Sequence, residues 1–339
     1  MPRNTVAQTQ QLGREVTPGA VVPATKRLGS LAFALSPSVE SEAFRPKGMK
    51  YPTLVQANKE WSEGDLEGAA TYEELIYPLA SIFGAPATSQ VMDGATATGV
   101  YEHVFSPNTR GGDTPVTFTV EDGAVGAEAE RVGHVLVTDF GLELSRSEVS
   151  LSGSAFGQRM ATAVAMTPNA TDVSTDLSPI LPGQVCAYVS DTQAGLGLAA
   201  NRLGTLLSVS PSVGGRFSPT WYLNCVLDSF GTFSEQPEPD FSLELLVEAN
   251  AAGLAWVDRY RDGATRFVRI EANGPTVYSN GATVLKKSLV WDFATKVMEP
   301  GEKSDKDGIY ALGPTLQVVH DPAWGRATRV SVRNKLAAL

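Results

Sequence analysis

The residues that could bind a dinucleotide occur without the surroundings that such a site needs. Gly195, Gly197 and Ala200 fit a GxGxxA pattern. A dinucleotide site requires a helix directly after this pattern and an acidic residue about 20 positions later. Here residues 214–218 read GGRFS, and the sequence predicts a strand after the glycines. We therefore do not expect a nucleotide cofactor.

A second candidate is a calcium loop around Asp305–Gly308, which reads DKDG. Lys303 stands where the first ligand of such a loop would be, and Pro314 stands where the bidentate glutamate would be. A β-turn explains the Asp-Gly pair better. The sequence thus predicts a hairpin turn rather than a calcium site.

Histidine and cysteine are too scattered for a metal centre or a disulfide framework. The sequence also lacks GxxxxGK[ST], GxSxG and CxxC motifs. We predict that the protein is not an enzyme and uses no metal and no cofactor, with both cysteines as free thiols. The residues concerned are His103, His134, His320, Cys186 and Cys225.

Carboxylates recur with a spacing of two residues in two places. In Trp61–Ala69, which we expect to be a strand, the acidic residues alternate with other types. Ser242–Ala249 alternates in the same way. Side chains two apart on a strand share a face, so each stretch would present an acidic stripe. An ordinary solvated sheet face is the alternative. The stripes consist of Glu63, Asp65, Glu67, Glu244 and Glu248.

The elements that carry these stripes occur twice along the chain. Arg27–Val39 reads RLGSLAFALSPSV, and Arg202–Val213 reads RLGTLLSVSPSV. Two helix-like windows and two strand-like windows also match, in the same order. These are Thr71–Gly84 with Asn250–Gly263, and Leu136–Phe140 with Leu289–Phe293. A tandem duplication explains a repeat of this length.

The repeat sets the predicted domains: a first module at 1–163 that includes an N-terminal arm, a linker at 164–184 and a second module at 185–339. The first copy carries an insertion within Ala85–Gly112. Ser36–Ser62 has few regular signals and fits either a long loop or an extended hairpin.

Each module is predicted to be mainly β with one flanking helix. Thr71 and Glu74 form a capping-box pattern before the first helix, which Pro78 should kink or split. In the second helix we expect Leu254 and Val257 to face inward. The predicted strands are 28–35, 116–121, 132–144, 148–154, 185–189, 203–210, 221–228, 243–247, 266–271, 285–293, 315–320 and 328–333.

Composition limits the classes of function. The 339-residue chain has a net charge of −10, and 42% of its residues are hydrophobic. Such a chain has the material for real cores, while its negative charge argues against a surface that grips nucleic acid. No run of about 20 apolar residues is present, so we expect no membrane segment.

Several stretches together resemble one family. They lie in the N-terminal arm, in the predicted strand and helix at 64–84 and in the strands that follow. They are Leu12–Glu15, Pro18, Gly19, Pro23–Thr25, Leu28, Gly64–Gly68, Thr71–Leu75, Phe83–Gly84, Phe118–Gly123, Val135–Leu144 and Val149–Gly153. This combination resembles the major tail tube protein of long-tailed, non-contractile bacteriophages, in the form that fuses two tube modules. The position of Pro78 and the insertion in the first copy depart from the family pattern.

The resemblance implies a β-sandwich or barrel module with a flanking helix. Six modules, and hence three chains, would form a ring with pseudo-sixfold symmetry, and stacked rings would form the tube of a virion tail. DNA would pass through the lumen without specific binding during ejection. The partners implied are further copies of the chain, the tape measure protein, the tail terminator and the tail tip proteins, after assembly in the bacterial cytoplasm.

Two site hypotheses follow from this resemblance. The five carboxylates of the acidic stripes would line the lumen and repel phosphates. The loop Phe44–Pro52, which consists of Phe44, Arg45, Pro46, Lys47, Gly48, Met49, Lys50, Tyr51 and Pro52, would stack one ring on the next. Two alternatives stay open: another tail or baseplate ring protein of the same fold, or a β-sandwich module that binds carbohydrate or a receptor.

Overall fold

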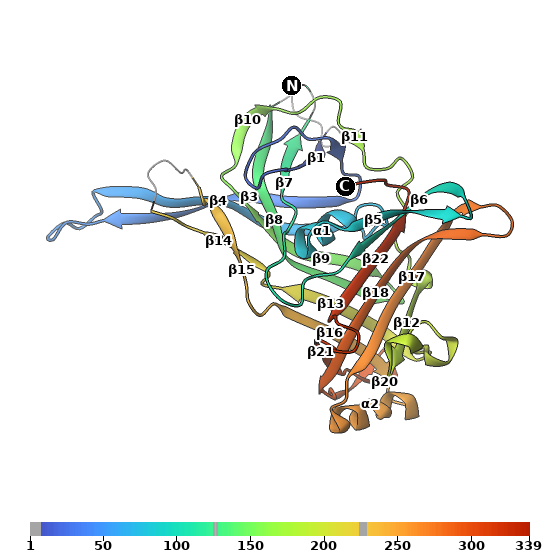
Figure 1. Cartoon of the computed structure of the whole chain (residues 1–339). Helices are drawn as coiled ribbons and strands as arrows, with labels where there is room; N and C mark the ends of the chain where they lie inside the picture. The colour runs from blue at the N-terminus through green and yellow to red at the C-terminus, as the bar shows by residue number, and fades with distance from the viewer. Residues whose placement is uncertain (1–7, 125, 127, 224–228) are drawn as a thin grey trace.

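Strands dominate the structure, as the sequence predicted. The computed structural model describes residues 8–124, 126, 128–223 and 229–339, and it is mainly β (Figure 1). In these residues two α-helices occur, α1 (Ile76–Phe83) and α2 (Ala251–Asp262). No helix in the described ranges is both long enough and apolar enough to cross a membrane.

The first half of the chain supplies the strands β1 to β11. Their bounds are β1 (Thr9–Arg14), β2 (Lys26–Arg27), β3 (Leu31–Phe44), β4 (Leu54–Gly68), β5 (Ala87–Asp93), β6 (Thr96–Phe105), β7 (Phe118–Gly123), β8 (Glu128–Ser145), β9 (Val149–Gly157), β10 (Ala161–Ala165) and β11 (Thr171–Asp172). The insertion predicted within Ala85–Gly112 forms the hairpin β5–β6.

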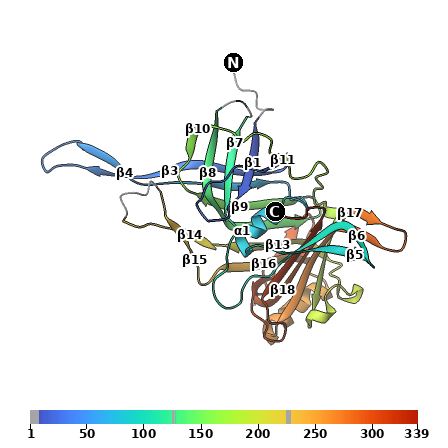
Figure 2. The same cartoon turned by 45° about the horizontal axis from the view of Figure 1, so that its top comes forward.

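The segment Ser36–Ser62 is an extended hairpin, one of the two predicted alternatives. β3 and β4 pair from Leu31 opposite Gly68 to Phe44 opposite Leu54. The outer part of this hairpin projects from the body of the molecule in both views (Figures 1 and 2). We call residues 37–61 the arm, and residues 44–53 its tip.

The second half supplies β12 to β22. Their bounds are β12 (Val185–Ser190), β13 (Leu206–Gly214), β14 (Phe217–Thr220), β15 (Thr232–Glu235), β16 (Asp240–Glu248), β17 (Arg266–Ser279), β18 (Val284–Glu299), β19 (Lys303–Lys306), β20 (Ile309–Leu312), β21 (Thr315–Val318) and β22 (Thr328–Asn334). Of the predicted strand 221–228, residues 221–223 are not in a strand and the rest lie outside the described residues.

One long antiparallel sheet runs through both halves. Its strands follow the order β3-β4-β9-β8-β13-β16-β21-β18. The link between the halves is the pairing of β8 with β13, in which Gly141 lies opposite Ser212 and Ser145 opposite Ser208. On its other side β18 pairs with β17, and β17 pairs with β12.

β8 also belongs to a second sheet. Its first residues pair with β7 and β10, and β7 continues through β1 to β2. The strand passes from one sheet to the other near His134, which has a left-handed backbone with φ of 54°. In the second half, β22 pairs with the start of β18 and is extended by β6 and β5. The first-half hairpin β5–β6 therefore completes a second-half sheet, as Figure 2 shows.

α1 lies inside the molecule, and every one of its residues is buried. It begins at Ile76 rather than at Thr71. Half of the predicted capping box forms, since Thr71 Oγ1 accepts a hydrogen bond from Glu74 N–H at 3.2 Å, while the Glu74 carboxylate accepts hydrogen bonds from Gly29, Ser30 and Leu31 N–H. The predicted split of the helix at Pro78 is wrong. The helix is continuous because Pro78 lies in the first turn, where a missing N–H costs no intrahelical bond.

α2 has the predicted ends. Asn250 Oδ1 accepts hydrogen bonds from the N–H groups of Ala252 and Gly253, and Gly263 ends the helix with a left-handed φ of 58°. The predicted inward face is only partly right, since Leu254 is 41% exposed while Val257 is half-buried. The residues of α2 that are buried are instead Gly253, which lies against the Glu248 carbonyl, and Trp256.

The segment 164–184, the predicted linker, packs against the first half. Thr171 pairs with Lys26, and the Ile180 N–H donates to the Ala70 carbonyl at 2.8 Å. Val173 and Ile180 are buried in a hydrophobic core that contains residues of both halves. The two halves are thus packed together along the linker as well as through β8 and β13.

A buried ion pair fixes this packing. Lys287 on β18 and Glu73 before α1 are each 2% exposed, with Nζ 2.6 Å from Oε1. Lys287 Nζ also donates to the Asp176 carbonyl at 2.7 Å and to Ser178 Oγ at 2.8 Å. The ammonium therefore connects the second half to the first half and to segment 164–184.

Removing one partner of this pair should be costly. We expect Lys287→Met to lower the free energy of unfolding by about 3–5 kcal/mol, because Glu73 would remain buried and unpaired. Adding Glu73→Gln should recover most of the loss. Urea unfolding of both variants measures this. A double variant as unstable as Lys287→Met would contradict it.

Candidate functional surface

One face of the long sheet is polar and the other forms the core. On β4, Ser62 and Leu66 point inward and are buried, while the acidic residues between them are exposed. On β16, Leu243, Leu245 and Val247 are buried in the same way. We call the outward side the polar face.

The structure brings all five predicted carboxylates onto the polar face. Paired residues of neighbouring strands point to the same side of a sheet. Asp65 pairs with Ser154, and Glu67 pairs with Ser152. The row continues from Ser152 through Gly141 and Ser212 to Ser242 on β16. On β16 the alternation then places Glu244 and Glu248 on that side, and both are exposed.

Most of the remaining polar face consists of small hydroxyl residues that the sequence reasoning missed. The sequence of β9 and β13 shows that these hydroxyl residues alternate with apolar residues. It does not show that they align with the acidic stripes of other strands. They are Ser150, Ser152, Ser154, Ser208, Ser210, Ser212 and Ser242. Glu143 and Asp139 on β8 add two carboxylates. From Trp61 on β4 to Glu248 on β16, no strand position on this face is a lysine or an arginine.

A second feature covers one end of the polar face. Residues 215–223 and 229–239, which include the ribbon β14–β15, follow β13 and pack on the first half. Arg216 is buried and forms an ion pair with Asp113 at 2.5 Å. Phe230 contacts Phe156 and His134, with ring centroids 5.3 and 5.2 Å apart. The second-half ribbon is therefore anchored by a buried charge pair and an aromatic cluster.

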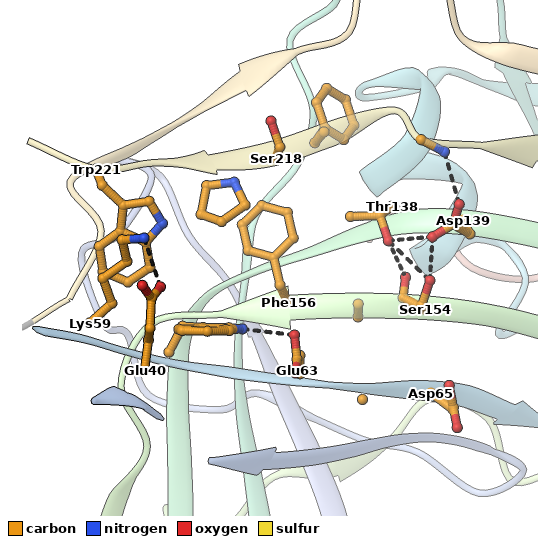
Figure 3. A pocket seen from close by; sticks show the side chains of 16 residues that line it. Glu40, Lys59, Glu63, Asp65, Thr138, Asp139, Ser154, Phe156, Ser218 and Trp221 are labelled. Carbon is orange, nitrogen blue, oxygen red and sulfur yellow. Dashed lines mark hydrogen bonds and ion pairs between the residues drawn. The ribbon is translucent and has the colours of Figure 1, made fainter. Parts of the chain in front are cut away.

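Between this ribbon and the base of the arm lies a cavity of about 560 Å³ (Figure 3). Its aromatic wall includes Trp61 and Trp221, whose rings meet edge to face at 5.8 Å, together with Phe156 and Phe217. Its acidic lining consists of Glu40, Glu63, Asp65 and Asp139, and Lys59 is its one basic residue in the described chain. We call this cavity the acidic pocket.

Asp139 holds the ribbon to the sheet at the pocket. Its carboxylate accepts hydrogen bonds from Ser154 Oγ, from Thr138 Oγ1 at 2.7 Å and from Gly215 N–H at 2.8 Å. Burial raises the pKa of Asp139, but these hydrogen bonds outweigh burial and keep the pKa below its usual value. Asp139 is therefore ionised at neutral pH.

The predicted stacking loop Phe44–Pro52 forms the tip of the arm. Met49 N–H donates to the Pro46 carbonyl at 3.1 Å, and Gly48 takes a left-handed φ of 86° to close the turn. Phe44, Met49 and Tyr51 are each more than half exposed. Arg45, Lys47 and Lys50 are also exposed, so the tip is both apolar and basic.

The other chemical motifs occupy structural positions. Gly195 and Ala200 lie in two short 3-10 helices with Gly197 in the turn between them, and Asp305 and Gly308 lie at the predicted turn between β19 and β20. His103 bonds to Thr88 and Asn334. In the described residues, no group of acidic, histidine and cysteine side chains could hold a metal ion. Cys186 is a free thiol, and Cys225 lies outside the described residues.

Comparison of the sequence with models of protein families and with curated proteins finds no match. The functional reading therefore depends on the polar face, the acidic pocket and the arm.

We expect His134 to make the packing of the ribbon sensitive to pH. Its ring is buried against Phe230 and Phe233, and neither ring nitrogen has a hydrogen-bond partner in the described part of the chain. Burial lowers the pKa of His134, and the nearby Glu15 charge only partly offsets this. As the pH falls below about 6.5, the unfolded state takes up the proton first, so stability decreases.

We expect the free energy of unfolding to fall between pH 7.5 and pH 5.5, and to fall less in His134→Asn. Asparagine tolerates the left-handed backbone at this position and does not titrate. Urea unfolding at both pH values tests this. Burial also lowers the pKa of His103, which accounts for the pH dependence that remains in the variant. Equal slopes in the two proteins would exclude the role of His134.

Proposed function

We propose that this chain is the structural subunit of a bacteriophage tail tube, and that the part of its polar face outside the acidic pocket lines the channel through which DNA is ejected. The observation that carries the proposal is the face of carboxylates and small hydroxyl groups that crosses both halves of the chain, with Phe156 and Leu246 as apolar residues on it. DNA carries one negative charge per about 1.7 Å of its axis, so a basic wall would hold it. A wall of serine and carboxylate side chains repels phosphates and lets DNA slide.

We also propose that the chain is a tandem duplication of one tube module. Supporting this, the strand order β3-β4-β9-β8 in the sheet is followed by the order β13-β16-β21-β18. The order along the chain also agrees, since α1 lies between β4 and β8 and α2 lies between β16 and β18. β9 and β10 pair with successive parts of β8, and β21 and β22 pair with successive parts of β18. The matched sequence stretches fall on β3 with β13, and on β8 with β18.

The pairing of β8 with β13 would then be the template for contacts between chains. Among the described residues, β3 pairs only with β4, and residues 296–299 of β18 pair only with β21. Both open edges would be closed by strand pairing between chains. Three chains would give a closed ring of six modules, and rings would stack into the tail tube of the virion. The expected partners are tape measure, terminator and tip proteins.

Electron microscopy of the purified, concentrated protein tests the proposal. We expect hollow tubes of uniform width built from rings with threefold or pseudo-sixfold symmetry. Persistent monomers that bind an oligosaccharide would instead support the β-sandwich binding module. Single rings that never stack would favour another ring protein of the tail.

Charge reversal on the polar face tests the lumen assignment. We expect tubes of the variant Glu67→Lys, Glu244→Lys, Glu248→Lys to retain linear double-stranded DNA in a salt-dependent manner, whereas wild-type tubes do not. The matched control is Asp258→Lys, Glu302→Lys, Asp307→Lys, which changes the same number of exposed acidic residues away from this face. Equal DNA retention by both variants would place the polar face outside the channel.

A further inference from the structure

We propose that the basic tip of the arm docks in the acidic pocket of a second copy of this chain. This inference rests on the proposed tube function and names the receptor for the loop assigned to ring stacking. The pocket would receive Arg45, Lys47 or Lys50 between its indole rings and its carboxylates.

The arm has the features of a segment that lacks its partner. It is a two-stranded hairpin beyond the edge of the sheet, and such hairpins are marginally stable when isolated. Its exposed apolar side chains are Val39, Phe44, Met49, Tyr51, Leu54 and Val55, which are 49–69% exposed. The three basic side chains at the tip form no ion pair with any described residue. Apolar and charged groups concentrated in this way mark an interaction surface.

The acidic pocket offers the complementary chemistry. Four carboxylates and one lysine line it, and the lysine is paired with Glu40 at 2.7 Å. In the described structure no basic side chain pairs with Glu63, Asp65 or Asp139. Glu63 Oε2 accepts a hydrogen bond from Trp61 Nε1 at 2.8 Å, which fixes the carboxylate beside the indole.

Aromatic rings beside carboxylates are suited to bind a guanidinium or ammonium group. Lys59 Nζ already lies 5.9 Å from the centroid of the Trp221 ring. Figure 3 shows Glu63 and Asp65 on one wall of the cavity and Trp221 on another. A cation that enters between these walls would meet a ring face and a carboxylate together.

The occupant must come from another copy. The arm strands stay paired from the sheet to Phe44 opposite Leu54. At about 3.3 Å per residue, the tip lies roughly 25 Å from Pro37 at the base of the arm. Glu40 and Lys59, at that base, line the pocket. The tip could reach the pocket of its own chain only if the ladder between β3 and β4 were broken.

Exchange of charges between the two surfaces tests the inference. The arm variant is Arg45→Glu, Lys47→Glu, Lys50→Glu, and the pocket variant is Glu63→Lys, Asp65→Lys. We expect each variant alone to lose assembly by sedimentation velocity and electron microscopy, and a chain with all five changes to recover it. Arg110→Glu, Arg146→Glu, Lys335→Glu is the matched control and should assemble normally.

A second measurement separates this inference from the tube proposal. A head-to-tail cyclised peptide of residues 43–53 is titrated against the whole chain while tryptophan fluorescence is followed, and a chain with Trp61→Phe and Trp221→Phe shows which part of the signal comes from the pocket. We expect saturable binding that weakens at least tenfold in the pocket variant. If the peptide binds but the protein forms no tubes, the tube proposal is contradicted and the docking inference is not. Normal tubes from both reversal variants, or a fluorescence response to an oligosaccharide and none to the peptide, would overturn the docking inference.

Discussion

The pairing of β8 with β13 is the interaction on which the rest of the structure depends. β8 is a long strand. Its second part pairs with β9 along one edge and with β13, from the second half, along the opposite edge. Because backbone groups of both halves satisfy one another there, the two halves share a sheet and a core instead of meeting at a separable interface. The continuity of the polar face is a direct consequence, since paired residues point to the same side.

Buried charges complement this ladder. Lys287 with Glu73, and Arg216 with Asp113, each join residues from different halves and are almost completely removed from solvent. An unpaired charge in such a place is strongly destabilising, so these pairs penalise any arrangement in which the halves separate. They contribute to the specificity of the packing, whereas the hydrophobic core around α1 supplies most of the stabilising burial.

The functional reading depends on surface pattern more than on any single residue. The proposed channel wall requires a consistent sign of charge over a large area. The serines between the carboxylates are compatible with this requirement because they are small and add no positive charge. The arm and the acidic pocket have the opposite character, since each concentrates aromatic and charged groups that suit a specific contact.

The sequence by itself determined the mainly β class, most of the strands and both ends of α2, because these follow from local alternation and capping. The arm was left open between loop and hairpin because both of its sides are exposed, so no apolar alternation marks its strands. Local patterns also misplaced Leu254, which is exposed, and predicted a split at Pro78 that does not occur, because the helix begins only two residues before the proline. Only the tertiary structure decided that acidic stripes far apart in the chain share one face, because strand pairing between distant segments leaves no local signal.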